Sequence, residues 1–554
     1  MKKKLLSIVL CIAMSATMLV GCGGSTETAA PEAPAATDEA AATDEAAATD
    51  EAATTDEAAA TDEAAAAPAE LDISTPVTLK MYLHGSTVND DKAVMEKVNE
   101  YLGEKLNVTL EPIWGTWGDF DEGSTLAING GDDVDIYFTC SWSADEYNSY
   151  AKKGAWVRLD NPDNNLMEKY GSDIWNALPE VLKVGAAVEG SDGYGVYALP
   201  AYKDYGTQNC WDINVDLLEK YGYTLDDIKN TDYYGFGDIM KTVKEGEGDS
   251  FYPLLAEGAV LERMVNNSII VNGDAGSLNV LSYYIDPTDV STDIGSKIEN
   301  KFATEEYKKF VEKTREYYEA GFIDPNDANK QTANDSRTSR QLKGDYLIGT
   351  QSYALGYEIQ ASQERGIHVE FVPCTPPYVD KTSTQGAMMA ISTASKNPDR
   401  AMAFLNLLNT DPYLMTLFTY GIEDVHYTTN ENGTIAFTEE HNNYMPWRNG
   451  MGNITILPSQ EGEGEDFFNK VFIPYYDSAK AIPAFGYVFD PTNVETELAA
   501  LANVGEEYAL ALSVGSVDPA TALPEFLDKL EQAGMSKVIE EANAQLDAYF
   551  ASEQ

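Results

Sequence analysis

Residues 77–114, "VTLKMYLHGSTVNDDKAVMEKVNEYLGEKLNVTLEPIW", alternate between two kinds of pattern. The stretch opens with seven residues and closes with eight that are rich in β-branched and large apolar side chains, as strands are. Between them, 91–106 carries apolar side chains at the spacing of one helix face: Val94, Val98, Leu102 and Leu106. A further strand is predicted at 133–138, "DVDIYF". Strand, helix and strand at this spacing predict a parallel sheet flanked by helices, an α/β fold.

The part of the chain with this texture runs from 71 to 554. That length exceeds what one hydrophobic core supports, so two lobes are expected. Later helices are predicted where apolar periodicity ends on a glycine or close to one, as helix C-caps do. They cover 304–321, 397–421, 494–515 and 519–534.

The first 22 residues have the form of an export signal. Three lysines are followed by an apolar run to Val20, which is too short to span a membrane. "LVGC", Leu19 to Cys22, resembles the bacterial lipobox, which implies removal of 1–21 and acylation of Cys22. We therefore expect the mature protein to be lipid-anchored at the outer face of the cytoplasmic membrane. The alternative is an ordinary signal in which Cys22 is incidental.

A low-complexity segment, 22–70, follows the cysteine. Thr-Asp-Glu recurs every six residues within it, from Thr37 to Thr61, and no large apolar side chain interrupts it. Such a segment cannot offset its ordering entropy and should be disordered. It is predicted to act as an acidic linker that holds a globular body away from the membrane.

Charge excludes one class of partner. The chain has 91 acidic and 37 basic residues, a formal charge of -54. Nucleic acid requires a basic surface, so we expect no nucleic-acid partner. Beyond Cys11 and Cys22 the cysteines are Cys140, Cys210 and Cys374, widely spaced and without a CxxC pair. They predict neither a disulfide framework nor a metal site, and are expected to be buried as small apolar side chains.

Enzyme signatures are missing. The four histidines are not spaced as zinc ligands, and no GxSxG, GxGxxG or Walker motif occurs. The sequence "DPNDAN", 324–329, has some features of a calcium loop but lacks its glycine and its terminal glutamate, so loop capping is favoured. We expect no cofactor, no metal and no catalysis. A secreted glycoside hydrolase stays as a weaker alternative, because the many acids supply pairs that a sequence cannot place in space.

Several motifs, in their order along the chain, resemble extracellular solute-binding proteins of bacterial ATP-driven importers. "YALPAYKDYGTQNCWDINVDLLEKYG", 197–222, is similar to the family's first crossing between lobes. "KGDYLIGTQSYALGYE", 343–358, resembles its strand and turn before a ligand-stacking aromatic residue, and "GAMMAISTASKNPDRAMAFLNLL", 386–408, its return strand and helix. The oligosaccharide-binding, maltose-binding-protein-like family 1 is most similar. The C-terminal part resembles a lipoprotein subgroup with a domain of unassigned role.

The resemblance implies a type II periplasmic-binding-protein-like fold, with two lobes, each a sheet flanked by helices, and a ligand cleft at the hinge. Lobe 1 would comprise 71–202 and about 386–425, and lobe 2 about 203–385 and 426–554. The implied function is capture of an extracellular solute, an oligosaccharide, and its delivery to an ABC permease by hinge closure, with the protein a monomer. Peptide binding by the same fold and a surface adhesin are the alternatives.

Ligands of such folds bind at loops that follow the carboxyl ends of strands. This rule selects 84–89, 114–120 and 140–144, and sugars favour aromatic planes with nearby polar groups. The candidate ligand-binding residues are Trp142, Tyr353, Trp114, Trp117, Trp447, Tyr202, Asp204, Trp211 and His84.

The candidates differ in their alternatives. For Trp142 a cleft position is favoured over the core, and Trp142 and Tyr353 are expected on opposite walls. For Trp114 and Trp117, packing within the loop is as well supported as a role in ligand binding. For Trp211, a position in the protein interior is equally well supported. For Asp204 ordinary surface polarity is slightly favoured. The hinge is expected near 202–208 and 382–386.

Overall fold

The computed structural model describes residues 71–116, 118–266, 268–270, 281–284, 286, 289–292 and 297–552. By its internal contacts the chain divides into 1–66 and 67–554, and every described residue belongs to the second unit. The predicted signal peptide, the predicted acylation site Cys22, the predicted linker 22–70 and Trp117 therefore lie outside the described residues.

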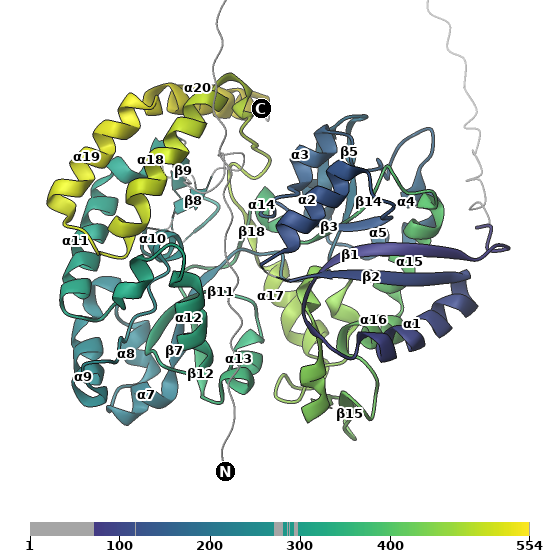
Figure 1. Ribbon diagram of the computed structural model, residues 1–554, viewed down its shortest axis with the longest axis horizontal. Coiled ribbons are helices and arrows are strands. Elements are labelled where there is room, and N and C mark those ends of the chain that lie inside the picture. The colour runs from purple at the N-terminus through teal and green to yellow at the C-terminus, as the bar shows by residue number, and fades with distance from the viewer. Residues whose placement is uncertain are drawn as a thin grey trace, which may run out of the picture. The chain divides into compact units, whose positions relative to one another are not determined.

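The first sheet is built on the pattern that opens the folded part of the sequence (Figure 1). Its strands are β1 (Val77–Val88), β2 (Val108–Gly115), β3 (Ile136–Thr139), β6 (Ala198–Pro200), β14 (Met388–Ile391) and β17 (Tyr444–Pro446). β2 and β3 pair with β1 in parallel, whereas β14 runs antiparallel to β3 and β6, and β17 antiparallel to β1. The predicted parallel strands joined by a helix are thus confirmed.

Helices around this sheet follow their apolar stripes. α1 (Asp91–Leu106) buries Val94, Val98 and Leu102, and ends where Asn107 takes a left-handed conformation with φ 52°. The single helix predicted over 397–421 is two, α15 (Pro398–Thr410) and α16 (Pro412–Tyr420). Asp411 separates them, because its side chain accepts the backbone N–H of Leu414 and caps the second helix.

The remaining elements of the first half complete this core. They are α2 (Phe120–Gly130), α3 (Tyr147–Lys152), α4 (Leu166–Tyr170), α5 (Ser172–Ala177), α6 (Glu180–Ala186), β4 (Ala187–Gly190) and β5 (Gly193–Val196).

The second sheet has the antiparallel order β11 (Ile348–Ser352), β7 (Asn209–Asn214) and β12 (Val369–Pro373). Helix α13 (Tyr357–Arg365) is tied to it by a buried ion pair, since Arg365 Nη1 lies 2.8 Å from Asp212 Oδ2. A smaller sheet joins β8 (Ser268–Ile270), β9 (Leu281–Tyr284) and β10 (Glu299–Asn300). Neighbouring helices are α7 (Val215–Lys220), α8 (Leu225–Lys229), α9 (Gly237–Glu247), α10 (Gly258–Asn266), α11 (Glu305–Glu319) and α12 (Ala333–Leu342).

The C-terminal helices belong to the second core. α18 (Glu495–Ser513), α19 (Pro519–Gln532) and α20 (Met535–Ser552) pack on one another, and α18 also contacts α10 and α11 (Figure 1). Leu498, Phe526 and Leu546 are buried in the same apolar cluster as Tyr307 and Phe310 of α11. The predicted helices 494–515 and 519–534 are confirmed, and they complete this core rather than forming a separate one.

Residues 427–476 differ from the expected lobe boundary, which assigned everything after 425 to lobe 2. Their buried side chains, from Tyr427 to Tyr476, lie in the first core. β17 explains this placement, because it adds to the far end of β1, with Tyr444 opposite Val88. The short elements here are β15 (Tyr427–Thr429), β16 (Ile435–Phe437) and α17 (Ile473–Asp477).

Three segments join the two cores: 201–208, 374–387 and 478–482. They are bonded to one another, since β13 (Tyr378–Val379) pairs in parallel with β18 (Lys480–Ala481) and forms an antiparallel bridge to Thr207. We call this arrangement of Thr207, β13 and β18 the crossing ribbon. The sequence predicts two crossings, and the third follows from the position of 427–476 in the first core.

Candidate functional site

An aromatic cluster gathers at the carboxyl ends of β1 and β3. Parallel neighbouring strands bring their ends to one edge of the sheet, which places His84 beside the loop that carries Trp142. Ring centroids lie 6.0 Å apart for His84 and Trp142, 5.9 Å for Trp142 and Trp447, and 5.7 Å for Phe138 and Trp447. We call His84, Phe120, Phe138, Trp142 and Trp447 the tryptophan cluster. Within it, Trp142 keeps 48% of its surface exposed.

His84 forms the buried base of the tryptophan cluster. Its ring stacks on Phe120 with centroids 4.0 Å apart and planes 22° apart. Burial lowers the pKa of His84 to about 4, although Asp121 and Asp119 act in the opposite direction. The imidazole is therefore neutral near pH 7, and the cluster presents uncharged aromatic surface.

The loop between β3 and α3 holds a buried acid, Asp145. Its side chain is fully buried and accepts a hydrogen bond from the Ser143 hydroxyl. Burial raises the pKa of Asp145 to about 7, and the neighbouring Asp121 carboxylate adds to this effect. Asp121 also accepts the backbone N–H of Ala144 at 3.0 Å. Asp145 was not among the residues predicted from the sequence, although it comes directly after the 140–144 loop that the strand-end rule selects.

Tyr353 lies where the second sheet meets the first core. It follows β11, and its backbone N–H donates to the Gln208 carbonyl at 2.7 Å. Its ring is 6.0 Å from that of Tyr475, in α17, and 6.5 Å from that of Phe371. The Tyr475 hydroxyl in turn donates to the Gln208 side chain. Within the described part of the chain Trp142 is not among its ring neighbours, so the structure brings Tyr353 together with Tyr475 instead.

Two polar side chains that the sequence did not single out lie beside the aromatic candidates, Glu358 near Tyr353 and Arg448 next to Trp447 in the sequence. Glu358, in the first turn of α13, has a buried Oε2 without a hydrogen-bond partner among the described residues. Burial raises its pKa, and the carboxylates of Glu370 and Glu463 act in the same direction. Arg448 follows Trp447, and its Nη1 lies 3.3 Å from the Tyr420 hydroxyl and 3.9 Å from Glu463 Oε1. Adjacency to Trp447 was the one sequence signal for Arg448.

Two other candidate tryptophans are fixed by packing. Trp211, on β7, is 7% exposed and stacks on Tyr233 with planes 8° apart, inside the second core. Trp114, at the end of β2, stacks on Phe418, and its indole N–H donates to Asp91 Oδ1 at 2.8 Å. Both tryptophans therefore have the packed surroundings that the sequence left open as the alternative to ligand binding.

The first crossing segment holds the last two candidates. Tyr202 is buried in the first core, and its backbone N–H donates to the Gly452 carbonyl at 3.1 Å. Asp204 is half-buried and forms an ion pair with Lys203, Nζ to Oδ1 3.2 Å. Asp204 therefore lies within one of the three segments that join the two cores.

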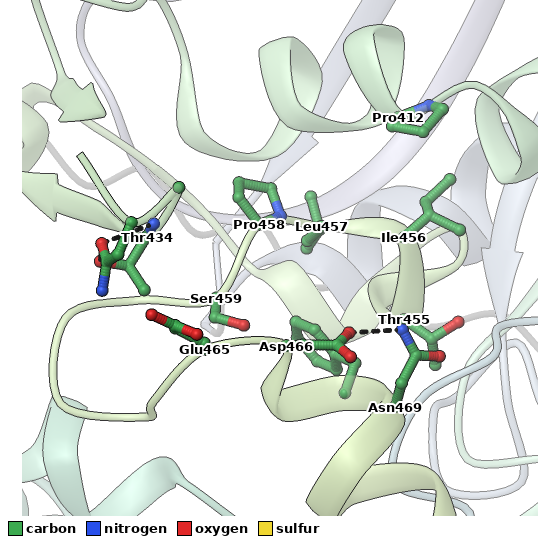
Figure 2. A pocket seen from close by; sticks show the side chains of 13 residues that line it. Pro412, Thr434, Thr455, Ile456, Leu457, Pro458, Ser459, Glu465, Asp466 and Asn469 are labelled. Atoms are coloured by element: carbon green, nitrogen blue, oxygen red, sulfur yellow. Dashed lines mark hydrogen bonds between the residues drawn. The ribbon is translucent and has the colours of Figure 1, made fainter. Parts of the chain in front are cut away.

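A separate pocket of about 490 Å³ is lined largely by residues of the 455–469 segment of the first core (Figure 2). Its lining is mixed: polar side chains come from Asn432, Thr434, Thr455, Ser459, Glu465, Asp466 and Asn469, and apolar ones from Pro412, Ile456, Leu457, Pro458 and Phe468. Asn469 donates to Asp466 Oδ1 at 2.6 Å, as the dashed line shows. No residue of the tryptophan cluster lines it, so this pocket is distinct from the aromatic surface.

The described residues contain neither a cluster of metal ligands nor a helix that could span a membrane. No group of three or more His, Cys, Asp or Glu side chains is arranged there to hold a metal ion. In "DPNDAN" the Asp324 carboxylate accepts the backbone N–H of Asn326 at 2.9 Å, which is a capping contact. No helix in the ranges given above is long and apolar enough to cross a membrane.

Residues 84–415 match the bacterial extracellular solute-binding protein family, and the chain belongs to this family. It is a family of binding proteins rather than enzymes. Residues 483–551 match a domain of unknown function, DUF3502, which covers most of α18, α19 and α20. The resemblance stated from the sequence is confirmed, as is the two-lobed type II fold class.

Relatives from Streptococcus pneumoniae are similar over most of their length. The chain is 26% identical over 482 residues to a carbohydrate ABC transporter substrate-binding protein, covering 86% of this chain and 91% of that protein. A crystal structure of the N-glycan transport solute-binding protein NgtS is similar with a TM-score of 0.71 and 25% identity, over 86% of this chain and 100% of that one. NgtS in complex with Man5GlcNAc matches with a TM-score of 0.68 and 27% identity, over 86% and 99%.

Proposed function

We propose that this protein captures an extracellular oligosaccharide and delivers it to the permease of an ABC importer. The observation that carries the proposal is the half-exposed Trp142, supported from below by the tryptophan cluster, in a solute-binding protein. An indole face buries the flat C–H face of a sugar ring, and neutral aromatic neighbours keep that surface apolar. The similarity to NgtS, solved with Man1GlcNAc and Man5GlcNAc, favours a glycan over a peptide.

Hydroxyl groups of the sugar need polar partners at the rim of an aromatic platform. Arg448 supplies donors next to Trp447, and Glu358 supplies a carboxylate near Tyr353 and Tyr475. We propose Trp142, Trp447 and Arg448 as contacts from the first core, and Tyr353 and Glu358 from the second. Asp204 is a candidate between them, whereas Trp114, Tyr202 and Trp211 act through packing.

Closure would take place at the crossing ribbon. The three paired segments are the covalent connections between the cores, so a change of angle between the cores must alter their dihedral angles. Affinity then depends on contacts made from both cores at once.

Calorimetric titration of the chain from Gly23 onward with Man1GlcNAc, Man5GlcNAc and an oligopeptide panel tests the proposal. We expect glycan binding, and a loss of about 2–4 kcal/mol, roughly 30- to 1,000-fold in affinity, for Trp142→Ala and for Trp447→Ala. Tyr194→Ala is the matched control, because Tyr194 is an exposed aromatic residue on β5 outside the cluster. Binding to peptides alone would refute the function, and wild-type affinity in both tryptophan variants would refute the site.

Two further parts of the proposal concern chemistry and location. We expect no turnover, so incubation with a bound glycan should leave its length unchanged, and accumulating shorter products would favour the glycoside hydrolase. Acylation of Cys22 would anchor the protein at the outer face of the membrane. Cys22→Ala should then release it to the medium or leave it unprocessed, whereas a processed variant that stays with membranes contradicts the anchor.

A further inference from the structure

The edge of Trp142 is bonded to a segment that joins the two cores. Its indole N–H donates to the Gly386 carbonyl at 2.8 Å. The preceding residue, Ser141, donates its backbone N–H to the Gln385 carbonyl at 3.0 Å and its hydroxyl to the Thr382 carbonyl at 2.9 Å. Three hydrogen bonds from two adjacent residues therefore end on 382–386, within the second crossing.

Gln385 fixes this segment from its other side. Its fully buried amide donates to the Gly185 carbonyl at 2.8 Å and accepts from Asn148 Nδ2 at 3.1 Å. Asn148 belongs to α3, which begins shortly after the Trp142 loop. Buried amides with several partners hold a single geometry well, because any displacement leaves polar atoms unsatisfied.

A short helix connects this segment to the crossing ribbon. β13 ends at Val379, and the next residue, Asp380, caps α14 (Lys381–Thr384) by accepting the Ser383 backbone N–H at 2.6 Å. The first crossing also reaches this point, since Lys203 Nζ lies 3.5 Å from where a Cβ on Gly386 would stand. Trp142 thus keeps part of its ring exposed and contacts the second crossing segment at its edge, at the same glycine that Lys203 of the first crossing approaches.

We propose that Ser141 and Gln385 are positioning residues that couple the orientation of Trp142 to the angle between the two cores. The ligand part of this inference rests on the proposed function, whereas the mechanical part does not. A sugar that stacks on the ring stabilises one ring orientation, and the hydrogen bonds pass that preference to 382–386 and through α14 to the crossing ribbon. By linkage, a change of the ribbon alters affinity at the ring by the same free energy.

Pulsed dipolar EPR between labels on Glu96→Cys in α1 and Glu312→Cys in α11 measures the distance between the cores. The chain from Gly23 onward is used; both positions are exposed, and Cys374→Ala is included throughout, which leaves Cys140 and Cys210, both buried, as its native thiols. In the ligand-free protein we expect Ser141→Ala and Trp142→Phe to broaden the distance distribution. Ser143→Ala is the matched control, because its hydroxyl bonds within the loop, to Asp145, and should leave the distribution unchanged.

Stopped-flow dissociation of Man5GlcNAc supplies the second readout. Trp142→Phe keeps a stacking ring but loses the indole N–H, and we expect roughly 2- to 10-fold faster dissociation, the effect of one hydrogen bond. Distance distributions that coincide with wild type in both variants would overturn the coupling, whatever the glycan does. Broadened distributions in a protein that binds no glycan would instead leave the coupling standing and refute the proposed function. Melting curves identify any variant that is merely unfolded.

Discussion

Replacing Asp145 by asparagine should make the folded protein less sensitive to rising pH. Burial raises the pKa of this carboxyl from its ordinary value of 3.8 to about 7, so the folded state binds the proton more tightly than the unfolded state. The stability that this group contributes is fully present below pH 3.8 and is lost as the pH rises through about 7. Asparagine resembles the protonated acid and does not titrate.

The size of the effect follows from the two pKa values. Between pH 5 and pH 8 the wild type should lose about 2–3 kcal/mol of unfolding free energy that the Asp145→Asn variant keeps. Asparagine retains an acceptor for the Ser143 hydroxyl, so the loop hydrogen bond is conserved. Urea unfolding at pH 5, 6, 7 and 8 measures the difference.

Asp226→Asn provides the control for this experiment, because Asp226 is an exposed acid on α8. Its unfolding free energy should follow that of the wild type at every pH. If the free-energy difference between wild type and Asp145→Asn is also constant from pH 5 to 8, Asp145 ionises normally in the folded state and the reasoning from its burial is wrong.

Three more predictions concern stability. Arg365→Met removes the cation beside the fully buried Asp212 and should cost about 3–5 kcal/mol in urea unfolding, whereas Arg158→Met, at a more exposed pair, should cost less than about 1 kcal/mol; equal costs would contradict the burial argument. Trp211→Ala should cost about 3–5 kcal/mol with little change in glycan affinity, and reduced affinity in the fully folded variant would return Trp211 to the site. Deletion of 483–554 should abolish hydrogen-exchange protection in α11, and protected α11 amides would show that the second core folds without α18–α20.

The fold was accessible from the sequence wherever a periodic pattern extended over a whole element. α1 occupies the predicted 91–106, because its four apolar positions mark one face and Asn107 ends it in a left-handed conformation. The helix predicted over 397–421 shows a limit of periodicity, since the apolar pattern continues through Asp411 while the backbone is interrupted there.

The lobe boundary could not be predicted from the sequence, because it depends on pairing between strands that are far apart in the chain. β17 has three residues and lies among 3₁₀ turns, so its sequence shows neither the periodicity of a helix nor that of a strand. Its pairing with β1 nevertheless assigns 427–476 to the first core. The third crossing followed from this pairing and was missed with it.

The candidate site was accessible in part. The strand-end rule depends only on topology, and it selected His84 and Trp142, which the structure places in one cluster. Trp211 was ambiguous because alternation along β7 does not say which face is covered. Tyr475 gave no signal, because its proximity to Tyr353 arises from contact between segments more than a hundred residues apart in the sequence.

The placement of α18–α20 at the C-terminus has a consequence for how the chain folds when its N-terminus emerges first. Residues 209–373 supply the second sheet, but Phe526 and Leu546 complete the core packed with it. Until the last helix has been released, the side of that core which these helices cover remains exposed to water. Non-local contacts of this kind slow folding and lengthen the time during which apolar surface is available for aggregation. The buried residues of the first core end at Tyr476, so this core should reach its native structure before the second. Folding intermediates are then expected to contain a native first core and a second core whose apolar side chains are still exposed to water.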